Sequence, residues 1–304
     1  MFNKIIALLL LSVALAAQAQ KPIKIVIPFT PGGVVDATNR ILHAALEREL
    51  GQQIGIESRP GAAGQIGLRH IAQNKTDDVL ITFIDAIALA NVIALDVQVE
   101  LEDFRYLTQV GRSSGIALIV KKGSPLKDLN AWRTYKGNPI TIGANGLGGA
   151  HHFYSWNLNN HIPFPRTDIF FKGINEALPM IIGGHIDAMW GQVASLEGYE
   201  RDGKIDVVVA TSKGSSNTFT TFRELGIDMP TTRWIVLSNQ TTDLATVRNV
   251  EAAINRLLSN SEFVKNLQVA GIVPELGLTS QSKSSTIQAL QQQRKFVEYV
   301  KSLK

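Results

Sequence analysis

The sequence has no cysteine among its 304 residues. Disulfide bonds, thiolate metal sites and a cysteine nucleophile are therefore all excluded. After the first twenty residues there is no second long apolar run, so no membrane-spanning transporter is encoded. The 30 basic residues barely outnumber the 26 acidic ones and form no basic block, which argues against a nucleic acid partner.

Motifs for catalysis and nucleotide binding are also missing. The sequence contains no G-x-x-x-x-G-K-[ST], no G-x-G-x-x-G and no G-x-S-x-G. His151 and His152 are adjacent, so on a helix they point about 100° apart and cannot chelate one metal ion together. We therefore expect no enzyme activity, no cofactor and no metal site. A serine–histidine–aspartate set assembled only in space leaves a secreted α/β hydrolase as an alternative.

The first nineteen residues have the layout of a secretory signal peptide. Lys4 precedes the apolar run IIALLLLSVALA, and small residues at Ala17 and Ala19 mark a cleavage site. The run is shorter than the ~20 residues of a membrane-spanning helix, which disfavours the alternative of an N-terminal anchor. We expect cleavage after Ala19 and export of a soluble mature protein to the periplasm.

Short β-rich runs alternate with helical patterns along the rest of the chain. Residues 23–29 predict a buried strand and residues 34–50 an amphipathic helix that stops at Gly51. A second alternating block begins with the strand pattern ITIGA. This alternation predicts an α/β fold with largely parallel sheets, arranged in two lobes with a ligand cleft between them.

The domain boundaries follow from where these blocks begin and end. Residues 1–19 form the signal peptide, residues 20–121 and 232–304 form lobe 1, and residues 122–231 form lobe 2. The chain's end is assigned to lobe 1 because helical patterns return there, over 243–258, 261–270 and 280–302.

Two glycine-rich turns each follow a predicted strand and open a predicted helix. The first is Thr30-Pro31-Gly32-Gly33, and the second lies within GANGLGGAHH at 143–152. Glycine permits close backbone approach, and the free N–H groups of a helix's first turn attract an anion. The two turns could therefore hold one small anion from both lobes, with a plain turn as the alternative at each.

Four side chains near these turns are candidates for ligand contact. Asp36, in a first helical turn, would repel a phosphate but suits the helix dipole. Asp85 would disfavour an anion in the cleft unless it meets an ammonium or hydroxyl group, and the alternative is a helix cap facing away from the ligand. Lys172 fits an anion ligand or a surface residue equally, and His151 fits a ligand contact or a packing role.

Several segments occur in an order and at a spacing that resemble the Bug/TctC family, the periplasmic solute-binding receptors of tripartite tricarboxylate transport systems. They are KPIKIVIPFTPGGVVDATNRIL, IESRPGAAGQIG, ITIGANGLGGAHH, FFKGINEALPMIIGGHIDAMW and VVVATS. The resemblance covers nearly the whole chain after the signal peptide. It implies a two-lobed periplasmic-binding-protein fold that closes on its ligand like a Venus flytrap, with mixed or parallel sheets, and a small carboxylate as ligand.

The resemblance also implies which residues bind the ligand. They are Phe29, Thr30, Pro31, Gly32, Gly33, Val34, Val35, Asp36, Asp85, Asn145, Gly146, Leu147, Gly148, Gly149, Ala150, His151, Phe171, Lys172 and Asp187, with Gly173 beside them. The chain departs from the family pattern at Val34, where serine or threonine is common, and at Gly148-Gly149, where hydroxyls are usual. These departures and Asp85 favour a ligand that is less anionic, more aromatic or amine-bearing.

The expected partners are a small organic acid or amino-acid-like ligand and the membrane subunits of a transporter. No nucleic acid is expected, and the receptor itself is expected to be a monomer. An extracytoplasmic sensor that docks on a membrane kinase is the second possible role, because the same closed form could serve either partner.

Overall fold

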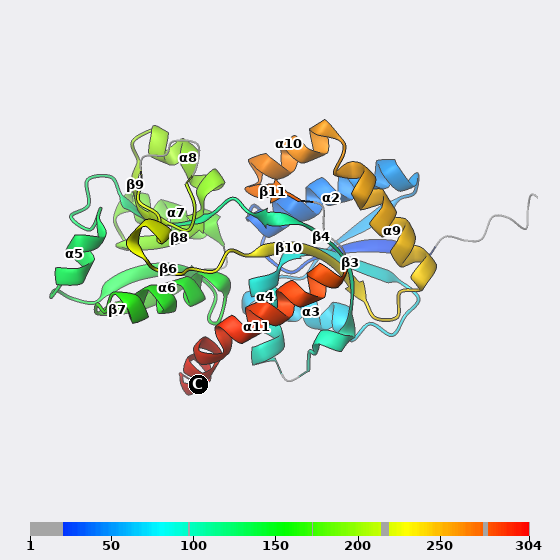
Figure 1. The fold of residues 1–304 in the computed structure, drawn as a ribbon, viewed down its shortest axis with the longest axis horizontal. Coiled ribbons are helices and arrows are strands. Elements are labelled where there is room, and N and C mark those ends of the chain that lie inside the picture. The colour runs from blue at the N-terminus through cyan, green and yellow to red at the C-terminus, as the bar shows by residue number, and fades with distance from the viewer. Residues whose placement is uncertain (1–20, 97, 172, 214–218, 276–278, 304) are drawn as a thin grey trace, which may run out of the picture.

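The computed structural model describes residues 21–96, 98–171, 173–213, 219–275 and 279–303. Two α/β lobes lie side by side and are joined by two chain crossings (Figure 1). Within the described ranges no helix is long and apolar enough to cross a membrane. The predicted signal peptide and Lys172 lie outside these ranges.

Lobe 1 is built on a six-stranded mixed sheet in the order β11-β4-β10-β3-β1-β2. In it β1 is parallel to β2 and β3, whereas β10 runs antiparallel to β3 and β4. The strands are β1 (Ile23–Ile27), β2 (Ile54–Ser58), β3 (Val79–Asp85), β4 (Phe104–Ser113), β10 (Arg233–Asn239) and β11 (Ile272–Pro274). The helices are α2 (Val34–Leu50), α3 (Gln65–Ala72), α4 (Ala86–Leu95), α9 (Leu244–Leu257), α10 (Ser261–Val269) and α11 (Thr279–Ser302), with short 3₁₀ turns η1 (Ala62–Gly64) and η2 (Leu101–Asp103).

Lobe 2 is built on a five-stranded mixed sheet in the order β7-β6-β8-β5-β9. In it β6 is parallel to β7 and β8, and β5 runs antiparallel to β8 and β9. The strands are β5 (Ile116–Lys121), β6 (Ile140–Asn145), β7 (Arg166–Phe171), β8 (Ala188–Gln192) and β9 (Ile205–Ala210). The helices are α5 (Leu129–Thr134), α6 (Ala150–His161), α7 (Ile174–Gly183) and α8 (Val193–Arg201), with the 3₁₀ turn η3 (Arg223–Leu225).

One predicted domain boundary needs correction. Residues 116–121, placed in lobe 1 by the boundary after residue 121, pair with β8 and β9 in the lobe 2 sheet. The chain therefore leaves lobe 1 between Ser113 and Ile116, one strand earlier than expected. It returns between Ala210 and Arg233, a segment that includes the expected second boundary at 231–232.

Helix α2 shows how the local sequence sets the position of the first glycine turn. Its buried face includes Leu42 and Leu46, and it ends at Gly51, whose left-handed φ of 62° lets its N–H bond the Glu47 carbonyl. The side-chain amide of Asn39 bonds both the N–H and the carbonyl of Phe83, at 2.9 and 2.7 Å. These buried bonds fasten α2 to β3 and fix where the helix begins.

Helix α11 contacts both lobes. It packs on α4 and β4, and its C-terminal end lies beneath lobe 2 (Figure 1). There the ring of Phe296 meets the His152 ring of α6 edge-on, with ring centroids 5.1 Å apart. Arg166 of β7 donates a hydrogen bond to the Tyr299 hydroxyl at 3.3 Å. The helix is therefore a third connection between the lobes, beside the two crossings.

Candidate functional site

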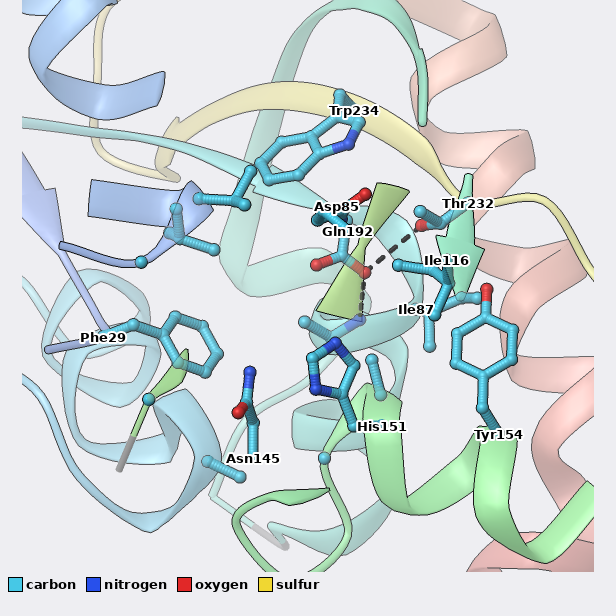
Figure 2. Close-up of a pocket in the computed structure, with 18 of the residues that line it drawn as sticks. Phe29, Asp85, Ile87, Ile116, Asn145, His151, Tyr154, Gln192, Thr232 and Trp234 are labelled. Carbon is cyan, nitrogen blue, oxygen red and sulfur yellow. Dashed lines mark hydrogen bonds between the residues drawn. The ribbon is translucent and has the colours of Figure 1, made fainter. Parts of the chain in front are cut away.

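A pocket of about 80 Å³ lies between the lobes, at the ends of strands from both sheets (Figure 2). Lobe 1 contributes Phe29, Thr30, Gly33, Val34, Val35, Ala63, Asp85, Ile87, Ala88, Thr232 and Trp234. Lobe 2 contributes Ile116, Asn145, Gly149, Ala150, His151, Tyr154, Gly173 and Gln192. Most of these side chains are apolar, and among the described lining residues there is no lysine or arginine.

Two helices begin at this pocket without a side-chain cap. The N-cap residues are Gly33 for α2 and Gly149 for α6, and neither offers a hydrogen-bond acceptor from a side chain. The first N–H groups of a helix have no partner within it, and the aligned peptide dipoles place about half a positive charge there. Both ends are therefore suited to a small anion held between the lobes.

The two glycine turns are built alike. Gly32 and Gly148 have φ angles of 86° and 78°, in the left-handed region that favours glycine. Each glycine N–H donates to the side chain four residues on: Gly32 to Asp36 at 3.0 Å, and Gly148 to Nδ1 of His152 at 3.1 Å. Asp36 and His152 thus stabilise the turns rather than face the pocket.

A third helix, α4, also begins at the pocket, but its own residue Asp85 caps it. Oδ1 of Asp85 accepts the Ala88 N–H at 2.8 Å and the Thr232 hydroxyl at 3.2 Å (Figure 2). The side chain lines the pocket, so the cap does not face away from a ligand. Burial raises the pKa of this carboxyl above its usual range, partly offset by these hydrogen bonds.

On the lobe 2 side, His151 is a buried polar group without a partner. Its Nδ1 has no hydrogen-bond partner, and only 8% of the residue is exposed. Burial lowers the pKa of His151 to about 4, so its imidazole is neutral at pH 7. A buried imidazole nitrogen without a partner is costly, and a ligand in the pocket would give it one.

Glycines allow the lobes to approach closely at the edge of the pocket. A Cβ at Gly146 would lie 3.1 Å from the Cβ of Ala63, across the cleft. A Cβ at Gly173 would lie 2.8 Å from the Thr30 hydroxyl oxygen. Larger residues at either glycine would therefore hold the lobes apart.

A second, larger chamber adjoins the pocket and shares Phe29, Thr30, Ala63 and Asn145 with it. Its volume is about 700 Å³. Its other lining residues are Pro60, Gly61, Ala62, Gly64, Gln65, Leu95, Gly146, Leu147, Phe170, Phe171 and Val300. None of the described lining residues is charged.

The structure brings most of the predicted site residues together. Phe29, Thr30, Gly33, Val34, Val35, Asp85, Asn145, Gly149, Ala150, His151 and Gly173 line the pocket, and Gly146, Leu147 and Phe171 line the adjoining chamber. Pro31, Gly32, Asp36, Gly148 and Asp187 line neither.

Asp187 was predicted to bind the ligand but lies away from the pocket. It precedes β8, and its carboxylate accepts the N–H and hydroxyl of Thr141 near the start of β6, at 2.8 and 2.7 Å. The pocket lies at the other ends of these parallel strands, beyond Asn145 and Gln192. Asp187 therefore links β6 to the start of β8 at the end of the sheet opposite the pocket.

Several pocket residues were not predicted. Gln192 ends β8, so the rule that ligands bind at the carboxyl ends of parallel strands could have found it. Thr232 and Trp234 reach the pocket because β10 inserts antiparallel between β3 and β4, and no local pattern signals such a pairing. Ile87, Ala88, Ile116 and Tyr154 also line it.

Comparison with known proteins agrees with this geometry. BugT of Bordetella pertussis is 24% identical over 276 residues, which cover 86% of this chain and 84% of BugT. The solved structure of periplasmic binding protein BugD superposes with a TM-score of 0.78 at 19% identity, covering 92% of this chain and 98% of BugD. MatC from Rhodopseudomonas palustris with bound malate gives a TM-score of 0.77 at 21% identity, covering 93% and 99%.

These structural likenesses establish the two-lobed periplasmic-binding-protein fold. The family model described as "Tripartite tricarboxylate transporter family receptor" (TctC) matches residues 38–301, most of the chain. That family consists of binding proteins, so the hydrolase alternative is not supported. The chain belongs to the TctC family of tripartite tricarboxylate transporter receptors.

Proposed function

We propose that this receptor captures a small carboxylate between its lobes, in the periplasm, and delivers it to membrane subunits of a transporter. The observation that carries the proposal is the pair of glycine-capped helix N-termini, Gly33 of α2 and Gly149 of α6, at one pocket between the lobes. Each offers backbone N–H groups and a partial positive charge to the same ligand. The malate bound to MatC supports the ligand class.

Closure of the lobes would bury the ligand, with the two crossings near residues 114–115 and 231–232 as hinges. The tight approach of Gly173 to Thr30 provides a test of this step. Because the φ of Gly173 is −177°, a valine fits its backbone, and only the space between the lobes is altered.

Isothermal titration calorimetry with a panel of small carboxylates tests the proposal. We expect one-to-one binding by the wild-type protein, and affinity at least tenfold weaker in Gly173→Val with an unchanged thermal unfolding midpoint. Product analysis of the titrated ligand should show no turnover. Failure of the whole panel to bind, or equal affinity in the valine variant, would contradict the proposal.

A further inference from the structure

We propose that the ligand is a zwitterion, an α-amino acid with an apolar side chain whose ammonium group pairs with Asp85. The inference rests on the proposed function, because it takes the ligand carboxylate to bind at the N-termini of α2 and α6. It adds two features of the ligand: an ammonium group next to its carboxylate, and an apolar side chain.

Asp85 is a carboxyl group buried in the pocket wall. It is 9% exposed, and the Ala88 N–H and the Thr232 hydroxyl both donate to its Oδ1. Backbone groups of Ile87 and of Asp85 itself also hydrogen-bond to this side chain. The other oxygen is turned away from the Ala88 and Thr232 donors (Figure 2). This second oxygen accepts neither of those two bonds, and because Asp85 lines the pocket, an ammonium group of a ligand could donate to it.

The described residues that line the pocket offer no counter-charge to Asp85. Among the described lining residues there is no lysine or arginine, and His151 is the only histidine. Burial keeps that imidazole neutral at pH 7, since its pKa is lowered to about 4. A buried carboxylate without a cation is costly, whereas a charged partner with good hydrogen-bond geometry offsets the cost. Burial raises the pKa of Asp85, and an ammonium group on the ligand would favour the ionised carboxylate again.

A dicarboxylate and a zwitterion differ in the charge that they would place beside Asp85. A dicarboxylate would bring two negative charges beside Asp85, and what the described lining sets against them is the partial positive charge, about half a unit each, of the uncapped N-termini of α2 and α6. A zwitterion places its carboxylate at those N-termini and its ammonium at Asp85, and the Nδ1 atom of His151 can bond the same head group. A zwitterion therefore pairs with both the helix N-termini and Asp85, whereas a dicarboxylate pairs with the helix N-termini alone.

The sizes of the two cavities indicate where the side chain of the ligand would lie. The inner pocket, about 80 Å³, is small and holds all of these polar groups. The adjoining chamber, about 700 Å³, shares Phe29 and Asn145 with this pocket and is lined by Leu95, Leu147 and Phe171. An amino acid head group in the inner pocket would direct a large apolar side chain into this chamber, which has no described charged residue to bind a second carboxylate.

Matched ligand pairs that differ only in the ammonium group test the proposal. Calorimetry would compare L-phenylalanine with hydrocinnamate, and L-leucine with isocaproate, with malate as the dicarboxylate. Asp85→Asn removes the charge but keeps the α4 cap, because asparagine is a good N-cap residue. The control is Asp243→Asn, since Asp243 caps α9 through the same bond to the third N–H and also accepts a threonine hydroxyl, outside the pocket.

We expect the wild-type protein to bind each amino acid at least tenfold more tightly than its matched acid, as for loss of one charged hydrogen bond. Asp85→Asn should abolish that ratio and Asp243→Asn should preserve it. If hydrocinnamate, isocaproate or malate binds as tightly as the amino acids, or if the ratio survives in Asp85→Asn, the zwitterion proposal is wrong while the proposed function stands. If no compound binds, both are wrong.

Discussion

The two glycine turns share one construction but differ in what surrounds them. In lobe 1 the Gly32 N–H is held by the buried Asp36, whose other oxygen accepts a hydrogen bond from the half-exposed Arg40 at 2.9 Å. In lobe 2 the Gly148 N–H is held by His152, which is fully buried among the rings of Phe170, Phe296 and Tyr299. The lobe 1 turn therefore depends on local bonds, and the lobe 2 turn depends on tertiary packing.

This difference predicts that the two turns respond differently to substitutions. The ion pair that closes the lobe 1 turn reaches water through the half-exposed Arg40, so water can replace contacts that Arg40 loses in a small shift. A turn closed by a buried imidazole cannot absorb such a shift, since each lost contact leaves an unpaired group or a void. Lobe 2 should thus be the more sensitive half of the site.

The largest expected contrast is between alanine substitutions at the two N-cap glycines. A Cβ at Gly149 would overlap the carbonyl oxygen of Asn145, whereas a Cβ at Gly33 would lie 3.8 Å from its nearest neighbour. We expect Gly149→Ala to lower the free energy of unfolding by about 3 kcal/mol, and Gly33→Ala to change it by less than about 0.5 kcal/mol. Urea denaturation followed by circular dichroism measures both, and similar effects in the two variants would refute the contrast.

The next contrast concerns the side chains that close the turns. His152→Leu preserves much of the volume but leaves the Gly148 N–H without its acceptor, so stability should fall by about 1–3 kcal/mol. Asp36→Asn keeps an acceptor oxygen for Gly32 and should cost less than about 1 kcal/mol. Equal losses in the same denaturation experiment would show that the two turns do not differ in this way.

A third contrast is in pH dependence. Burial lowers the pKa of His152 to about 4, with Asp168 raising and Arg166 lowering it by smaller amounts. Because an unfolded histidine has a pKa near 6.5, the unfolded chain takes up the proton first as pH falls. Stability from His152 is therefore complete above pH ~6.5 and is lost toward pH 4, by up to about 1.4 kcal/mol per pH unit.

Denaturation midpoints between pH 7 and pH 5 check this slope. The wild-type protein should lose more stability over that range than His152→Leu, which retains His151 and Asp85. The comparison isolates His152, since the raised pKa of Asp85 contributes with the opposite sign in both proteins. A slope unchanged by the substitution would mean that His152 does not titrate in this way.

The smallest expected effect is at Val34, in the lobe 1 turn. Val34 lines the pocket without a polar group, beside the exposed end of the turn. Val34→Ser adds a hydroxyl next to the α2 N-terminus, and we expect affinity for a carboxylate to rise by up to about tenfold. Calorimetry against one acid would measure it, and weaker binding would show that the valine packs against the ligand.

Sequence patterns predicted the parts of this fold that local chemistry determines. The α2 helix lies at 34–50 as predicted, because an apolar face and the Gly51 stop are both readable. The first crossing was misplaced because β5 is apolar on both faces and looks the same in either lobe. Trp234 and Thr232 enter the pocket through long-range antiparallel pairing, which local periodicity does not encode.

The site was predicted best where backbone carries the chemistry. A glycine that follows a strand and precedes a helix indicates a helix N-terminus without a side-chain cap, and residues of both turns line the cavities. Asp187 was assigned by resemblance alone, although it precedes β8 and the carboxyl end of that strand, at Gln192, is the end that lines the pocket.

A crystal structure of the protein with its tightest-binding carboxylate tests the central claim most directly. The account predicts one carboxylate between the lobes, with its oxygens within hydrogen-bond distance of first-turn N–H groups of both α2 and α6. A carboxylate bound to only one lobe, or outside the pocket that Gly33 and Gly149 share, would contradict it.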